Sequence, residues 1–200
     1  MKGFFSLFTD SAKELKSIRC LTVTGIFIAI SMVIEAFTIQ LPYAKINFAF
    51  LAIAVIGMLF GPSVGLLAGG ACDIVGYLVH PEGAFMPIYI LVAMLQGMLY
   101  GMLLYQRNQA LCEKKLQLCI RIVIARLLDV AIINLVLNTT LNYHYGFIHA
   151  DTLQAAMVAR IVKNLVELAA DLPLMLLLLP IALTAYRFIC RGSVRMKTAG

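Results

Sequence analysis

The sequence predicts an all-α integral membrane protein in which residues 1–200 form one domain of six transmembrane helices, with both termini in the cytoplasm. Of the 200 residues, 62% are hydrophobic and 13% are charged, whereas soluble domains have roughly 45–50% and about 25%. Several apolar runs approach the 20 or so helical residues that cross a bilayer core of about 30 Å. Six such runs leave no room for a soluble domain.

The positions of the basic residues predict the orientation. Most of the 16 Lys and Arg residues fall in the stretches 2–19, 107–121 and 187–197, whereas the loops between them on the opposite side hold only Lys45. Because positively charged loops stay in the cytoplasm, both termini and the 107–121 loop are expected there. This distribution also explains the net charge of +6 without a nucleic-acid partner.

Residues 1–17 are expected to form an interfacial segment ahead of the first transmembrane helix. Their phenylalanines suit the boundary between lipid and water. The pair Asp10 and Ser11, followed by Glu14, is typical of a helix N-cap with a capping box. The segment lacks the apolar stretch and small-residue cleavage site of a signal peptide.

Six apolar segments define the predicted helices. The second and third are short and are separated by the tight turn Gly61–Ser63. The sixth is long and contains Pro173 and Pro180, so a kink or a break is expected there. The predicted helices span 18–39, 46–60, 62–80, 86–106, 117–140 and 155–188.

The sixth helix carries polar residues that are costly in a membrane. Five of these polar residues form a stripe within an arc of about 100° on one helix face. Ionisable groups at this depth should face protein or a water-filled cavity. Two interpretations stay open, namely a ladder of ion pairs within the bundle or an outward-facing site for an anionic ligand. The stripe comprises Arg160, Lys163, Asn164, Glu167 and Asp171.

The fifth helix offers the same choice between structural and ligand-binding roles. Arg126 and Asp129 are three residues apart and are interpreted as a structural pair, and Arg126 could also pair with Asp171 on the sixth helix. Nearer the predicted outer end, Asn138 and Thr139 either join helices or contact a ligand.

The third helix and the loop after it add further candidates. Asp73 shares a helix face with glycines and is interpreted as a buried structural residue between helices. In the loop HPEGAFMP, residues 80–87, Phe85 lies near Gly83 and either covers a ligand or anchors at the membrane interface.

The sequence shows no sign of catalysis or of a bound metal. It contains no GxxxxGK[ST] nucleotide loop and no HExxH or GxSxG motif. Its five cysteines form no CxxC pair and no metal-ligand spacing. No enzyme activity and no cofactor is therefore predicted, and any ATP-driven work must come from a partner chain.

Four runs of residues resemble the folate-specific S components, or substrate-binding subunits, of energy-coupling factor (ECF) transporters. The same order and spacing extend over nearly the whole chain. The resemblance implies a six-helix bundle in the bacterial plasma membrane, surrounded by lipid, that binds a vitamin, namely folate, at the outer face. It also implies delivery inward with a coupling (T) subunit and two ABC-type ATPases, which bind the ATP. The runs are INFAFLAIAVIGMLFGPSVGLLAGGACDIVGYLVHPEGAFMP (46–87), GMLYGMLLY (97–105), NTTL (138–141) and ARIVKN (159–164).

The resemblance also implies which residues contact the ligand and the partner. In the family the first helix packs on the coupling subunit through two small residues four apart, which are Gly25 and Ala29 here. The glutamate carboxylates of folate suit cations, and its flat pterin ring suits an aromatic lid and amide groups. The expected ligand contacts are Asn138, Thr139, Arg160, Lys163, Gly83 and Phe85, to which the polar stripe adds Glu167.

Two alternatives to folate import stay open. One is the same architecture for another heterocyclic vitamin or precursor. The other is a stand-alone proton-coupled carrier that uses Arg126, Asp129, Glu167 and Asp171 as a relay, and it predicts ligand flux without ATPase partners.

Overall fold

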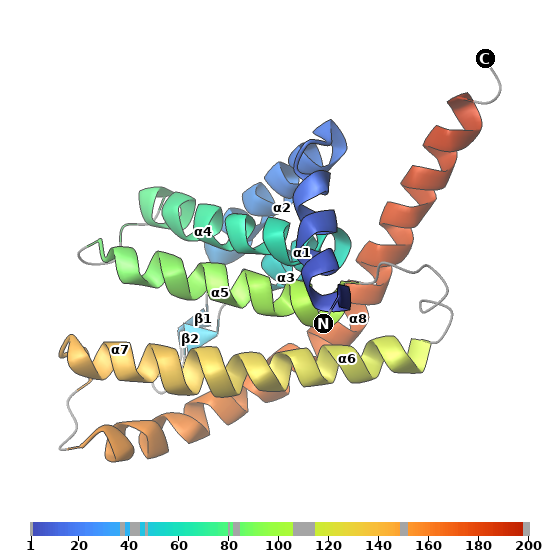
Figure 1. The fold of residues 1–200 in the computed structure, drawn as a ribbon. Helices are drawn as coiled ribbons and strands as arrows, with labels where there is room; N and C mark the ends of the chain where they lie inside the picture. The colour runs from blue at the N-terminus through green and yellow to red at the C-terminus, as the bar shows by residue number, and fades with distance from the viewer. Residues whose placement is uncertain are drawn as a thin grey trace.

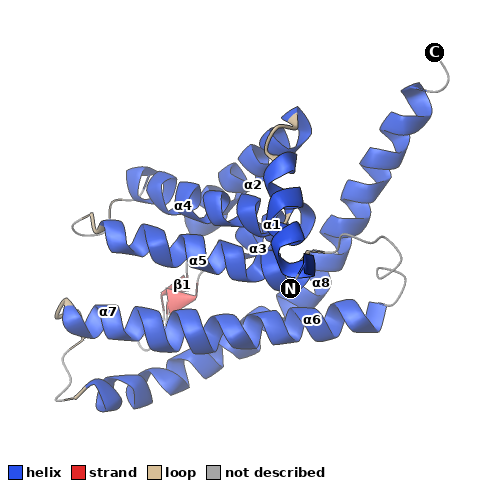
Figure 2. Ribbon diagram, viewed as in Figure 1, coloured by secondary structure: helices blue, strands red, loops and turns tan. Residues whose placement is uncertain are grey.

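The computed structural model describes residues 2–36, 39–40, 45–46, 48–79, 81, 85–105, 115–148 and 152–197. Between the connecting segments these residues are helical, apart from one antiparallel pair of two-residue strands, β1 (Ile39–Gln40) and β2 (Lys45–Ile46) (Figure 2). The predicted all-α class is therefore confirmed except for this short pair. Ile39 and Ile46, predicted as the last residue of the first helix and the first residue of the second, lie in these strands instead.

The helices follow the predicted order. Within the described part of the chain, four of them (α2, α4, α5 and α8) are long and apolar enough to cross a membrane. Helix α3 has 11 residues, fewer than the roughly 20 that a full crossing needs, so the count of six spans remains a prediction. The helices are α1 (Lys2–Glu14), α2 (Ile18–Ala36), α3 (Phe50–Phe60), α4 (Pro62–Val79), α5 (Pro87–Leu104), α6 (Lys115–Leu128), the π-helix η2 (Asp129–Asn138), α7 (Thr139–His144) and α8 (Leu153–Lys197).

The segment predicted as one helix over 117–140 consists of α6, η2 and α7 in unbroken succession. Its middle ten residues are π-helical, a rare form with wider turns that occurs frequently at functional sites. The Thr139 hydroxyl donates a hydrogen bond of 3.1 Å to the backbone carbonyl of Asn134, five residues earlier. The π-helix therefore changes the direction of the amide side chains that follow it relative to an ordinary helix.

Helix α1 does not begin with the capping box that the sequence predicted. Ser11 lies inside α1, is fully buried, and accepts hydrogen bonds from the backbone N–H groups of Ser63 (3.0 Å) and Val64 (3.2 Å). In return, the Ser63 hydroxyl donates to the backbone carbonyl of Phe8 at 2.9 Å. The first N–H groups of a helix have no partner within it, so Ser11 caps α4 rather than its own helix.

Helices α3, α4 and α5 pack with their backbones in contact because glycines line their interface. A Cβ atom on Gly57 of α3 would lie 2.8 Å from the backbone nitrogen of Gly101 of α5, and Gly65 of α4 approaches the backbone of Gly97 in the same way. Gly61, between α3 and α4, has a φ of 91°, which side-chain-bearing residues avoid. Figure 1 shows α4 and α5 running side by side.

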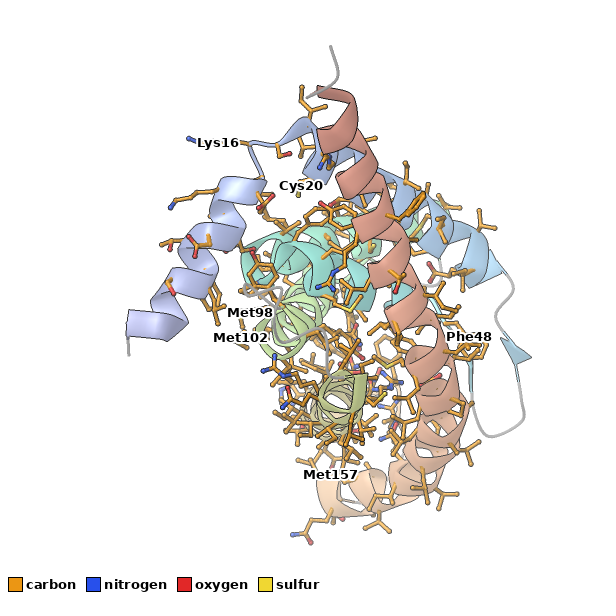
Figure 3. All side chains as sticks on the ribbon, turned by 90° about the vertical axis from the view of Figure 1, so that its right-hand side faces the viewer. Lys16, Cys20, Phe48, Met98, Met102 and Met157 are labelled. Atoms are coloured by element: carbon orange, nitrogen blue, oxygen red, sulfur yellow. The ribbon has the colours of Figure 1, made fainter. Side chains whose placement is uncertain are left out.

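Two apolar clusters surround α3, and almost all of its residues are buried. One cluster joins it to α5, α6 and α8, and the other joins it to α2 and α4. A helix that is covered on all sides must be apolar all round, which accounts for its uninterrupted sequence FLAIAVIGMLF. Figure 3 shows side chains filling the space between α8 and the other helices.

Helix α8 is one continuous helix of 45 residues that contains both Pro173 and Pro180. The sequence predicted a kink or a break, and the helix is not broken, but its ribbon changes direction along its course (Figure 1). Proline removes a backbone hydrogen bond and crowds the preceding turn, which explains the bend. The first part of α8 thereby reaches α7, and its later part packs on α3, where the rings of Tyr186 and Phe60 lie 5.5 Å apart.

We expect Gly57→Ala to lower the melting temperature of the detergent-purified chain. The new methyl group would force α3 away from α5, at a cost of about 1–3 kcal/mol. Gly25→Ala is the matched control, because a Cβ there would meet no atom within 4 Å and alanine forms helices better than glycine. An equal loss of stability in both variants, measured by thermal unfolding, would contradict the close backbone contact.

Candidate functional site

The most deeply buried charges form one network between α6, η2 and α8. The exposed fractions of Arg126, Asp129 and Asp171 are 3%, 0% and 2%. Arg126 donates through Nη1 to Oδ2 of Asp129 at 2.5 Å and through Nη2 to Oδ2 of Asp171. The structure thus contains both ion pairs that the residue spacing suggested.

Helices α5 and α3 complete this network. The Tyr100 hydroxyl donates to Asp129 at 2.9 Å and accepts a hydrogen bond from Arg126 at 3.1 Å, and the Gln96 amide donates to Asp129 at 3.0 and 3.2 Å. The guanidinium carbon of Arg126 lies 4.0 Å from the centre of the Phe50 ring, a cation–π contact. Charges that are paired and hydrogen-bonded in this way suit a structural contact between helices better than a site that takes up ligand.

A second polar group lies in the first half of α8. Lys163 is paired with Glu167 at 3.4 Å. Arg160 interacts electrostatically with Glu167 and with Tyr89 of α5, but its buried Nη1 has no hydrogen-bond partner among the described residues. Asn164 is 5% exposed. Its Nδ2 atom also has no hydrogen-bond partner among the described residues. Two buried donors on one helix face are thus open to acceptors.

Amide side chains run along η2 and α7, which pack on α8. The Asn138 amide donates to the side-chain oxygen of Asn134 at 3.2 Å, and the Asn142 amide donates to the backbone carbonyl of Asn138 at 2.6 Å. The Tyr89 hydroxyl donates to the side-chain oxygen of Asn142 at 3.0 Å. Thr139 is fully buried. Tyr89 therefore connects α5 and α7 beside Arg160, a link that the sequence analysis missed.

The helix ends that carry the other expected ligand contacts lie at the same end of the bundle. Figure 1 shows the end of α4, the start of α5, the end of α7 and the start of α8 together on the left. Phe85, just before α5, is 44% exposed, and its ring centre lies 4.9 Å from that of Tyr77 of α4. Gly83 lies outside the described residues. The structure thus brings these four helix ends to one end of the bundle, but it describes only part of the loop between α4 and α5.

Helix α2 contacts α4 through one face and leaves another uncovered. The buried Ser31 hydroxyl lies 3.5 Å from the sulfur of Cys72, beside which Asp73 is partly buried. Gly25 and Ala29 are exposed. These two small residues are thus uncovered on the surface of α2.

Over the described ranges, no group of three or more His, Cys, Asp or Glu side chains could hold a metal ion.

Comparisons with known proteins agree with this arrangement of helices. Residues 19–179 match the family described as "ECF transporter, substrate-specific component". The folate transporter FolT of Clostridium novyi (strain NT) is 28% identical over 152 residues, which cover 75% of this chain and 81% of that protein. The folate transporter FolT of Leuconostoc mesenteroides is 23% identical over 151 residues, which cover 74% and 77%. A crystal structure of FolT bound with folic acid has a similar fold, with a TM-score of 0.63 and 24% identity over 81% of this chain and 92% of that chain.

Arg126→Met is expected to lower the free energy of unfolding by about 3–5 kcal/mol, because two carboxylates would stay buried without their cation. Thermal unfolding in detergent measures the effect. Arg121→Met, on the same helix and partly exposed, is the control and should change stability by less than about 0.5 kcal/mol. Similar losses in the two variants would argue against a special role for the network.

Proposed function

This chain belongs to the family of ECF transporter substrate-specific components, and from that premise we propose that it binds folate at the outer membrane face and delivers it inward. The names of its relatives and of its structural neighbour support folate as the ligand. Delivery would use ATP hydrolysed by two ABC-type ATPases, coupled through a T subunit in the bacterial plasma membrane. The chain itself would bind the ligand without catalysing a reaction.

The observation that carries this proposal is the buried Nη1 atom of Arg160, which has no hydrogen-bond partner among the described residues. Folate is an anion with two glutamate carboxylates, and arginine binds carboxylates through strong charge-assisted hydrogen bonds. Arg160 lies in the first turns of α8. The start of α8 lies at the opposite end of the bundle from the start of α6 (Figure 1), which follows the predicted cytoplasmic loop. An anion entering from outside would therefore reach the start of α8 first. The other residues we assign to the site are Lys163, Glu167, Asn138, Thr139, Gly83 and Phe85.

The structure supports the proton-coupled carrier less well. A relay needs carboxylates that are free to accept and release protons. Here Arg126 binds both Asp129 and Asp171, and Lys163 is paired with Glu167. These ion pairs suit a structural role for the four residues better than a proton relay. Another heterocyclic vitamin remains an alternative ligand and is tested below.

Calorimetric titration of the detergent-purified chain tests the ligand. We expect tight one-to-one binding of folic acid and no binding of thiamine or riboflavin. Arg160→Ala should weaken folate binding about 10- to 100-fold, as expected for the loss of a charge-assisted hydrogen bond. Arg187→Ala, which removes a cation near the opposite end of the same helix, should bind as the parent does. Absence of folate binding to a folded parent chain would overturn the proposal.

Ala29→Trp is expected to block folate uptake and to leave folate binding intact, because Ala29 is exposed on α2 and a bulky ring there would hold off a partner helix. Uptake is measured in vesicles that contain the chain with its coupling subunit and ATPases, and binding is measured by titration. Ile124→Trp is the control, since Ile124 is 45% exposed on α6. Loss of binding in Ala29→Trp would show instead that this face belongs to the core of the fold.

A further inference from the structure

The proposed site leaves out one buried side chain of the stripe that has a donor without a partner among the described residues, namely Asn164. Asn164 is 5% exposed and its Nδ2 is buried. This donor makes no hydrogen bond within the described ranges of the chain. Buried polar groups without a partner are rare in native proteins, and each one calls for an explanation. A ligand that supplies an acceptor is such an explanation.

Arg160 lies one helical turn from Asn164 on the same face of α8 and has the same deficit at Nη1. One turn separates the two positions by about 5.4 Å along the helix. Lys163 differs, because Glu167 lies 3.4 Å from its ammonium group. The open donors of the stripe are therefore Arg160 and Asn164, and the charge of Lys163 is already balanced within the chain.

The nearby amide oxygens of η2 and α7 already accept hydrogen bonds. The side-chain oxygen of Asn142 accepts one from Tyr89, and that of Asn134 accepts one from Asn138. Each of these oxygens has a second lone pair, yet neither accepts a hydrogen bond from Asn164. An acceptor from outside the chain would therefore satisfy this donor.

We propose that Arg160 and Asn164 together bind the carboxylate and the adjoining amide carbonyl of an N-acyl-glutamate. Arg160 binds the carboxylate, and Asn164 donates from Nδ2 to the carbonyl oxygen one turn further into the bundle. A guanidinium suits an anion, whereas a neutral amide donor suits a neutral oxygen. Folate contains this unit, because an amide links its glutamate to the benzoyl ring. The inference rests on the proposed function and adds to it the part of the ligand that α8 recognises.

The proposal predicts opposite effects on stability and on binding. Asn164→Leu removes an unsatisfied buried donor, so the melting temperature of the ligand-free chain should stay the same or rise. The same variant should bind folate about tenfold more weakly, as expected for one lost hydrogen bond. Asn164→Ala provides a smaller replacement should leucine not fit. Leu165→Ala, on the adjacent and 63% exposed position, is the matched control and should bind folate as the parent does.

Titration with two ligands separates the roles of the two residues. The second ligand is the methylamide of pteroic acid, which keeps the amide carbonyl and lacks both carboxylates. Asn164→Leu should weaken the binding of both ligands about equally. Arg160→Gln should weaken folate binding about 10- to 100-fold and change methylamide binding by less than about twofold. This crossed pattern would support the proposal.

Other outcomes would overturn the role of Asn164, the role of Arg160 or the proposed function. Unchanged folate affinity in Asn164→Leu and Asn164→Ala would exclude Asn164 as a ligand contact. A loss for folate alone would exclude the bond from Asn164 to the amide carbonyl. Equal losses for both ligands in Arg160→Gln would exclude recognition of the carboxylate by Arg160. Absence of folate binding to the folded parent chain would overturn the proposed function itself, and the inference with it.

Discussion

The buried guanidinium of Arg126 is the constraint on which the rest of the bundle depends. A charge inside an apolar bundle is tolerated only when it is neutralised and hydrogen-bonded, and this one is bound by Asp129 and Asp171. Those two carboxylates belong to η2 and α8, and Tyr100 adds α5. The position of α8 along its neighbours is therefore fixed at one buried point. Because Arg160 lies on the same helix, the placement of the open donors also depends on this point.

The sequence predicted well whatever depends on neighbours along the chain. Long apolar runs locate most helix ends to within a few residues, because hydrophobic length and turn residues mark helix ends. The exception is the sixth helix, which was predicted to end at 188 and continues to Lys197. The Arg126–Asp129 and Lys163–Glu167 contacts follow from spacings of three and four residues in a helix. The i,i+4 pairing was only one of two interpretations of the stripe, since spacing cannot show which groups a fold leaves without partners.

What the sequence could not show depends on residues distant along the chain. Ser11 looked like the cap of its own helix, yet it caps α4, more than fifty residues later. Tyr89 and Gln96 gave no signal beyond being polar in an apolar helix, because their partners lie on other helices. Asn164 belonged to the predicted stripe but was passed over in favour of charged neighbours. Its significance comes from burial and the lack of a partner, which only three-dimensional structure reveals.

The glycine contacts among α3, α4 and α5 have a mechanical consequence. Helices that touch through backbone atoms, as at Gly57 and Gly101, have no layer of side chains that could change rotamer and let one slide past the other. These three helices should therefore move as a rigid body during a transport cycle. Shear and hinge motion would be confined to α8, with its two internal prolines, and to the wide turns of η2. The proposed ligand contacts on η2, α7 and α8 would thus lie in the deformable part of the protein, whereas Phe85 adjoins the rigid part at the start of α5.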